Sequence, residues 1–163
     1  MTSTSPSIPG ERGTDRAQVD RALLALEIER VLTAGIGLTA IAIAETEDAA
    51  DLTLAQWRAL VVTVRHDGVR VGELAAHLGM SVPSASRLVR RIETRGLVIA
   101  RRAENDRRAT NVWLTADGRR LVEAVVGRRR ALIGRALGDG TDARAEAAVA
   151  TLREIADRLE TLA

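Results

Sequence analysis

Cysteine, lysine, phenylalanine and tyrosine are all absent from this 163-residue sequence, and tryptophan occurs only twice. The absence of cysteine excludes disulfide bonds, thiol-based redox sensing and thiolate metal sites within the chain. Because Phe and Tyr are missing, the core must be packed mainly from Leu, Ile, Val and Ala. Strands favour aromatic residues, so this composition suits a helical fold better than a sandwich of sheets.

Long apolar segments are missing as well. The longest apolar stretch runs from Val31 to Ala44, which is shorter than the roughly 20 residues needed to cross a bilayer, and we expect it to be a buried helix at an interface. Residues 1–15 are polar and lack the apolar region of a signal peptide, so they predict a disordered arm. The expected location is the cytoplasm, with no membrane partner.

Residues typical of catalytic and metal sites are scarce. The only histidines, His66 and His77, lie eleven positions apart with no motif around either, and we expect ordinary surface residues. The sequence contains no recognisable pair of catalytic carboxylates, nucleophile–base set, phosphate-binding loop or zinc-ligand spacing. We therefore expect no enzyme activity, no metal and no cofactor.

Charge is distributed unevenly, although the net charge is only +2. Residues 1–66 carry six arginines and nine acidic residues, a net charge of −3. Residues 87–108 carry eight arginines and three acidic residues, a net charge of +5 within 22 positions. A local excess of this kind beside an acidic or neutral remainder is typical of a surface that binds a polyanion.

Apolar periodicity, capping residues and glycines predict a mostly α-helical chain. Two short strands are expected at Leu97–Ala103 and Ala109–Thr115, joined by a polar tip at residues 104–108. The expected helices lie at about residues 14–47, 54–67, 70–78, 82–95 and 116–137, followed by a C-terminal helix.

The C-terminal helix carries an apolar seam at spacings of four and three residues, which is typical of a helix that packs against a partner. The seam consists of Ala148, Leu152, Ile155, Leu159 and Leu162.

The helix after Ser81 has two distinct faces. Ser81 is expected at the N-cap and Pro83 in the first turn. One face is apolar, and the opposite face carries Pro83, Ser86, Arg87 and Arg90. As the second helix of a helix-turn-helix, it would enter the major groove, where Arg reads guanine and Ser contacts base or phosphate. Ser81 and Ser84, near the helix N-terminus, are placed to hold a phosphate.

The polar tip of the hairpin strengthens this interpretation. It contains Asp106, Arg107 and Arg108, and two adjacent arginines repel each other in free solution. A hairpin of this length can reach the minor groove, where arginine is attracted by concentrated negative potential.

Two motifs resemble the MarR family of bacterial winged helix-turn-helix regulators, within a similarity that covers Leu52–Leu121. The first is S-R-L-V-x-R-I-E-x-R-G-L-V at Ser86–Val98. The second is D-x-R followed by L-T-x-x-G, at Asp106, Arg108, Leu114, Thr115 and Gly118.

The resemblance implies an obligate homodimer, joined through its N- and C-terminal helices, that binds pseudo-palindromic double-stranded DNA. It implies Arg108 in the minor groove with Asp106 bracing it. The implied major-groove residues are Ser84, Ser86, Arg87 and Arg90, and we add the neighbouring Arg91 and Arg107 to the candidate DNA-binding set.

Many members of the family release DNA when a small aromatic or phenolic effector binds, whereas members that sense oxidants through cysteine form a branch that this chain cannot join. Trp57 lies where family members can border the ligand cavity, although a single Trp at helical spacing is more often a core residue. Trp113 is expected to pack the hairpin onto the domain, and Arg58 and Arg65 to lie on a solvated face. The run Arg128–Arg130 is expected to be dimer-surface charge or a contact to flanking DNA.

The expected fold is mostly α-helical with a small β-hairpin wing: a winged helix-turn-helix at 51–115, with its wing at about 97–115, flanked by dimerisation helices at 16–50 and 116–163. Residues 16–163 would form a single domain. The function expected is that of a homodimeric repressor. The alternative is a winged-helix protein-interaction module that has lost DNA binding, because a fold alone does not fix a function.

Overall fold

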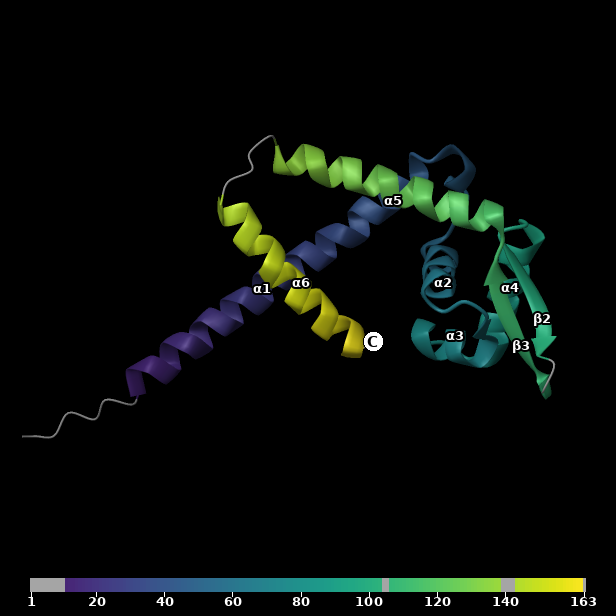
Figure 1. The fold of residues 1–163 in the computed structure, drawn as a ribbon, viewed down its shortest axis with the longest axis horizontal. Helices are drawn as coiled ribbons and strands as arrows, with labels where there is room; N and C mark the ends of the chain where they lie inside the picture. The colour runs from purple at the N-terminus through teal and green to yellow at the C-terminus, as the bar shows by residue number, and fades with distance from the viewer. Residues whose placement is uncertain (1–10, 104–105, 139–142, 163) are drawn as a thin grey trace, which may run out of the picture. The chain divides into compact units, whose positions relative to one another are not determined.

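The computed structural model describes residues 11–103, 106–138 and 143–162, and the side chains within these ranges except those of residues 11–20, 106–108, 143–147, 160 and 162. The elements, in chain order, are α1 (Glu11–Ala44), a 3₁₀ turn η1 (Glu47–Ala49), α2 (Leu54–Arg65), β1 (Val69–Arg70), α3 (Val71–Leu78), α4 (Val82–Thr94), β2 (Val98–Ala103), β3 (Asp106–Leu114), α5 (Ala116–Leu137) and α6 (Ala143–Leu162) (Figure 1).

The chain divides by its contacts into two units, residues 1–39 and residues 40–163. The first unit contains most of α1, and the second contains every other element. The sequence suggested one domain over residues 16–163, with a boundary between helices and winged domain near residue 50. That assignment of domains stays a prediction.

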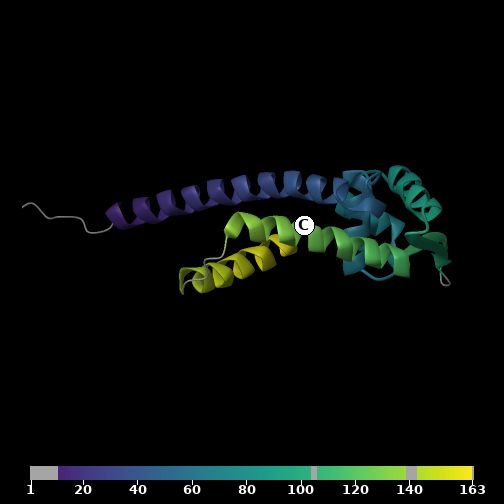
Figure 2. The same ribbon diagram turned by 90° about the horizontal axis from the view of Figure 1, so that it is seen from above.

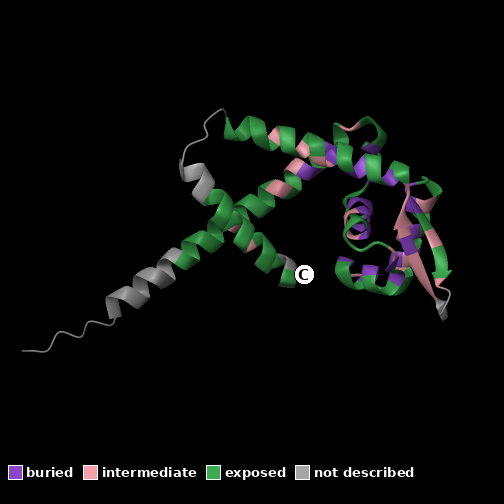
Figure 3. Cartoon of the chain, in the orientation of Figure 1, coloured by how far each residue is buried: buried purple, intermediate pink, exposed green. Residues whose placement is uncertain are grey.

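A single apolar core holds the second unit together. Its largest fully buried side chains come from five different elements, α2, α3, α4, β3 and α5, and are Leu60, Leu74, Ile92, Val112 and Val125. No Phe or Tyr contributes, as the composition required. Figures 1 and 2 show α2, α3, α4 and the sheet gathered together, and Figure 3 shows the buried residues concentrated there.

The turn between α3 and α4 is set by local sequence. Gly79 adopts a left-handed conformation, with φ of 65°. Its N–H bonds to the carbonyl of Ala76, and the N–H of Met80 bonds to the carbonyl of Ala75. This is a Schellman motif, which ends a helix and favours glycine because no Cβ is present to clash. The chain can then turn directly into α4, which produces the predicted helix-turn-helix.

The predicted hairpin is present, but it belongs to a sheet of three antiparallel strands in the order β1-β3-β2. β1 was not predicted, because its two residues, Val69 and Arg70, are too few to give an alternating pattern. The second strand of the hairpin was predicted to start at Ala109, whereas β3 begins at Asp106. Ala103 pairs with Asp106. This leaves a connection of two residues, which is the commonest length in hairpins.

Helix α1 begins at Glu11, so its first turn lies within residues 1–15, the segment expected to be a disordered arm. A negative charge is favoured at a helix N-terminus. Residues 1–10 lie outside the described part of the chain. The helix ends at Ala44 rather than Glu47, because the N–H of Thr46 bonds to the carbonyl of Ile43 and its hydroxyl to the carbonyl of Ala42.

The fold is therefore mostly helical with a small sheet, a winged helix-turn-helix with long flanking helices. Along the part of the chain that the structure describes, no helix is long and apolar enough to span a membrane.

Candidate nucleic-acid interface

Helix α4 separates apolar from polar residues across its two faces. Ala85, Val89 and Ile92 are buried, at 0%, 3% and 1% exposure. The opposite side leaves Pro83, Arg87, Arg90 and Arg91 exposed and Ser86 half-buried. The predicted polar face is thus largely exposed, and it carries three arginines in just over one helical turn.

The N-terminal turn of α4 organises one of these arginines. Ser81 occupies the N-cap position, yet its hydroxyl bonds to Oγ of Ser84 at 3.0 Å rather than capping the helix. Nη2 of Arg87 donates to the same Oγ at 3.0 Å. Ser84 therefore holds the guanidinium of Arg87 in one direction before any ligand binds, and reduces the side-chain freedom that Arg87 would lose on binding.

A groove of ≈ 440 Å³ lies between α4 and the sheet. It is lined by residues of β1, α3, α4 and β3: Arg70, Val71, Gly72, Glu73, Val82, Ser86, Ala109 and Thr110. Local sequence gives no sign of Arg70 and Thr110 at this site, because only the tertiary fold brings β1 and β3 beside α4.

The wing residues Asp106, Arg107 and Arg108 are placed by their backbone only. All three belong to β3, so the prediction that they form the turn is wrong. The register between β2 and β3 shifts between Arg102 and Ala103. This irregularity inserts residues 107–109 into β3, and such bulges bend a strand and redirect its side chains. The side chains of residues 106–108 lie outside the described part of the chain.

The base of the wing is fixed by a set of contacts around Thr115. Its hydroxyl donates to the carbonyl of Gly96 at 2.7 Å and accepts from the N–H of Gly118 at 3.0 Å, and its own N–H bonds to the carbonyl of Leu97. A Cβ added to Gly118 would lie 2.1 Å from the Leu97 carbonyl oxygen. The L-T-x-x-G motif therefore marks a helix cap and a close approach of two backbones.

Trp57 is a core residue, at 5% exposure, and it also borders a hollow of ≈ 380 Å³ between α2 and α5. Five valines form most of the apolar wall, and three arginines also line the hollow. Besides Trp57, the lining residues are Arg58, Val61, Val62, Val64, Arg65, Val122, Val126 and Arg129. Trp57 can therefore be a core residue and also lie beside a hollow, so the two predictions made for it do not exclude each other.

Trp113 is half-buried and lies against the loop before β1. A Cβ added to Gly68 would be 2.8 Å from the indole Nε1 of Trp113, so this contact depends on the glycine. The ring thus packs the hairpin against the segment that follows α2, which agrees with its expected structural role.

The two histidines are not isolated from each other. Their rings stack with centroids 4.8 Å apart and planes at 18°, and both residues are exposed. Nη2 of Arg58 bonds to the backbone carbonyl of His77 at 3.2 Å. Among the described residues, no cluster of three or more His, Asp and Glu side chains could hold a metal ion.

The arginine run on α5 does not act as one patch. Nε of Arg128 pairs with a carboxylate oxygen of Glu45 at 2.6 Å, and Arg129 is half-buried at the hollow beside Trp57, while Arg130 is exposed. Consecutive helical residues point about 100° apart, so the three side chains serve different surroundings.

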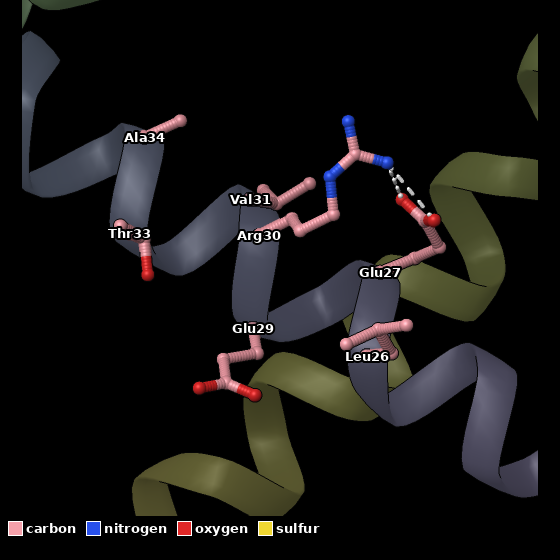
Figure 4. A pocket seen from close by; sticks show the side chains of 7 residues that line it. All are labelled: Leu26, Glu27, Glu29, Arg30, Val31, Thr33 and Ala34. Atoms are coloured by element: carbon pink, nitrogen blue, oxygen red, sulfur yellow. Dashed lines mark hydrogen bonds and ion pairs between the residues drawn. The ribbon is translucent and has the colours of Figure 1, made fainter.

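A further hollow lies along α1 and is drawn in Figure 4. Its seven lining residues all come from this one helix, and Glu27 and Arg30 form an ion pair across one turn. Walls from a single helix describe an open surface rather than an enclosed ligand site.

Comparison with known proteins agrees with this geometry. Residues 50–109, which include α2 to the start of β3, match the model of the MarR family. The organic hydroperoxide resistance transcriptional regulator of Bacillus subtilis (strain 168) is 28% identical over 95 residues, which are 58% of this chain. The chain spans 65% of the length of that relative, which is named as a regulator rather than an enzyme.

Solved structures share the fold over most of the chain. RV1404 from Mycobacterium tuberculosis superposes with a TM-score of 0.69 at 28% identity, covering 86% of this chain and 92% of that one. A MarR family protein from Bacillus stearothermophilus gives a TM-score of 0.70 at 23% identity, covering 86% and 97%. Residues 50–109 thus resemble the MarR family, and the chain shares its fold with solved proteins of that family.

Proposed function

We propose that the protein is a homodimeric transcriptional repressor that binds a pseudo-palindromic operator in double-stranded DNA. The observation that carries the proposal is the polar face of α4, where Arg87, Arg90 and Arg91 are exposed while the opposite face is buried. Arginine forms bidentate bonds to guanine in the major groove. As the second helix of the helix-turn-helix, α4 is the element expected to enter that groove.

The groove between α4 and the sheet supports the same proposal. It brings Arg70 and Thr110 beside Ser86, and residues of this kind contact phosphate oxygens and fix the register of a protein on DNA. Arg108, with Asp106 bracing it and Arg107 beside it, would occupy the adjacent minor groove. A protein of the same fold, MepR of Staphylococcus aureus, has been solved with a bound oligodeoxyribonucleotide; it is 21% identical and superposes with a TM-score of 0.60.

Exposed apolar residues on α1 and α6 support dimerisation. Val31 and Ile36 of α1 are 66% and 62% exposed, and Leu152 and Leu159 of α6 are 58% and 40% exposed. Side chains of this type are stabilised by removal from water. A second copy of the chain would cover them and would present two α4 helices to half-sites one helical turn apart, about 34–36 Å.

A small-molecule effector is the second element of the proposal. The hollow beside Trp57 combines an apolar wall with Arg58, Arg65 and Arg129 at its edge, which suits an aromatic or phenolic molecule carrying a negative charge. The Bacillus subtilis relative is named for organic hydroperoxide resistance. Because this chain contains no cysteine, its effector would act by binding and not by oxidising a thiol.

The alternative, a winged module that binds only proteins, gives no reason for the exposed arginines of α4. A regulator that binds DNA would act in the cytoplasm, where bacterial DNA lies. One titration can distinguish a protein that binds DNA from a module that binds only proteins.

The test is fluorescence anisotropy with purified protein and the DNA that flanks its own gene, in excess competitor DNA and at several salt concentrations. We expect binding at about 10⁻⁸ M or tighter, with an affinity that falls steeply with salt. Arg108→Ala should weaken binding at every site and reduce the salt slope by about one. Weak binding that competitor removes, together with salt-independent binding to a protein, would favour the alternative; unchanged binding by Arg108→Ala would refute the role given to the wing.

A further inference from the structure

One side-chain bond joins α4 directly to the wing. Oε1 of Glu93, in the last turn of α4, accepts a hydrogen bond from the backbone N–H of Ala100 in β2 at 2.8 Å. Glu93 is half-buried, and a bond to an ionised acceptor is about twice as strong as one between neutral groups. Neither DNA-facing surface uses this carboxylate.

The sheet leaves this N–H for α4 to bind. β2 lies at the edge of the sheet and pairs only with β3. The N–H of Thr115 bonds to the carbonyl of Leu97, and residues bonded across an antiparallel pair alternate along each strand. The pair Ala100 and Val112 is therefore of the type that exchanges no bonds, and the Ala100 N–H points out of the sheet toward Glu93.

Ala100 is also the point at which the hairpin leaves the body. Leu97 and Val98 are buried in the core, whereas Arg101 and Arg102 are exposed. β2 continues for three residues beyond Ala100 to Ala103, about 10 Å of strand. A rotation of about 10° at Ala100 would thus move the end of the strand by roughly 2 Å, whereas binding geometry must hold to about 0.5 Å.

We propose that Glu93 is a positioning residue that sets the angle between the recognition helix α4 and the wing, and so controls how the wing enters the minor groove. This inference rests on the proposed function, because it assigns the two elements to the two grooves. Glu93 itself touches no DNA in this scheme; it fixes the wing in the orientation that lets both elements bind at once.

Two substitutions separate the bond from the charge. Glu93→Ala removes both the acceptor and the negative charge. Glu93→Gln removes the same charge but keeps an oxygen that can accept from the Ala100 N–H. Because loss of a negative charge near DNA favours binding, Glu93→Gln should bind at least as tightly as the wild type, while Glu93→Ala should bind about tenfold more weakly. The probe is a DNA duplex that the wild-type protein selects from a random library.

A cycle with the wing tests whether Glu93 acts through it. In an Arg108→Ala background, we expect Glu93→Ala to change the affinity by less than about twofold, because residues that act through one element are not additive. A loss of the same size in both backgrounds would mean that Glu93 supports the fold generally, and would overturn the inference. Equal affinities of Glu93→Ala and the wild type would overturn it as well.

Hydrogen exchange at the Ala100 amide gives a readout that needs no DNA. Exchange should be faster in Glu93→Ala than in the wild type and should be slowed again in Glu93→Gln. If the wild-type protein selects no DNA, the proposed function fails while this measurement still tests the bond. If Glu93→Ala fails to fold, Glu93→Asp, which keeps the charge but has a shorter reach, replaces it in both arms and should show the same weakened binding and faster exchange.

Discussion

Helices α4 and α6 are both amphipathic, but they bury opposite amounts of their apolar faces. In α4, Val89 and Ile92 are 3% and 1% exposed. In α6, Leu152 and Leu159 are 58% and 40% exposed, and Figure 3 shows α6 exposed along nearly all of its described length. In α4 the exposed residues include three arginines, whereas α6 exposes its apolar residues together with its polar ones.

The free face indicates the kind of partner each helix can bind. Exposed arginines are well hydrated in water, and they bind most favourably to a polyanion, because binding releases the counterions of the polyanion. Exposed leucines are stabilised most when another apolar surface removes them from water. This difference agrees with the proposal that α4 binds DNA and that α6 binds a second copy of the chain, and each of the following substitutions tests one of these two assignments.

The largest effect is expected from Leu152→Glu on α6. A carboxylate buried without a partner at a dimer interface should cost about 4 kcal/mol or more, so the protein should become monomeric and lose operator affinity. Sedimentation equilibrium measures the first change. Ala150→Glu adds the same charge on the opposite side of α6 and should leave the dimer intact; a dimeric Leu152→Glu protein would remove α6 from the interface.

The next effect concerns the base of the wing. Gly118→Ala should lower the free energy of unfolding by about 2–3 kcal/mol, because its Cβ would meet the Leu97 carbonyl and the backbone must shift. Gly127→Ala lies on the same helix with nothing within 4 Å; it should raise the free energy of unfolding by about 1 kcal/mol. Urea denaturation compares the two, and similar values for both would contradict the close approach.

Arg87→Ala tests the charged face of α4. Base preference at one operator position should relax by about 2 kcal/mol, while affinity for DNA that differs at that position changes little. Selection from a library randomised within each half-site provides the measurement. A uniform loss over all sequences would instead assign Arg87 to the phosphate backbone.

The smallest effect is expected from Ser84→Ala. The substitution removes the oxygen that holds Arg87 and should weaken binding by about 1 kcal/mol, with no further loss in an Arg87→Ala background. Anisotropy on the four proteins of this cycle gives the coupling. Additive losses would mean that Ser84 contacts DNA by itself.

Much of the helical architecture could be predicted because its signals are local. Thr53 and Gln56 form a reciprocal cap at the start of α2, and Gly79 ends α3; both depend on residues within four positions. The two faces of α4 follow from spacing alone, so Ser86, Arg87 and Arg90 could be placed on its polar face without a structure.

Other features depend on residues distant in sequence. The strand β1 exists only because β3 pairs with it, and Arg70 joins the interface for the same reason. His66 and His77 give no sign in the sequence that their rings stack. In the sequence, Arg128 is one of three consecutive arginines, and nothing local indicates that it pairs with Glu45.

The sequence by itself determined the helices, their caps, the polar face of α4 and the lack of thiol chemistry, because each of these depends on composition or on neighbours within about one helical turn. Only the tertiary structure decided that Glu93 accepts a hydrogen bond from Ala100 of β2, that Gly118 allows two backbones to meet and that Trp57 is both a core residue and part of the wall of a hollow. The physical reason is that these contacts join elements whose approach is set by packing of the whole core, and local patterns carry no record of which surfaces meet.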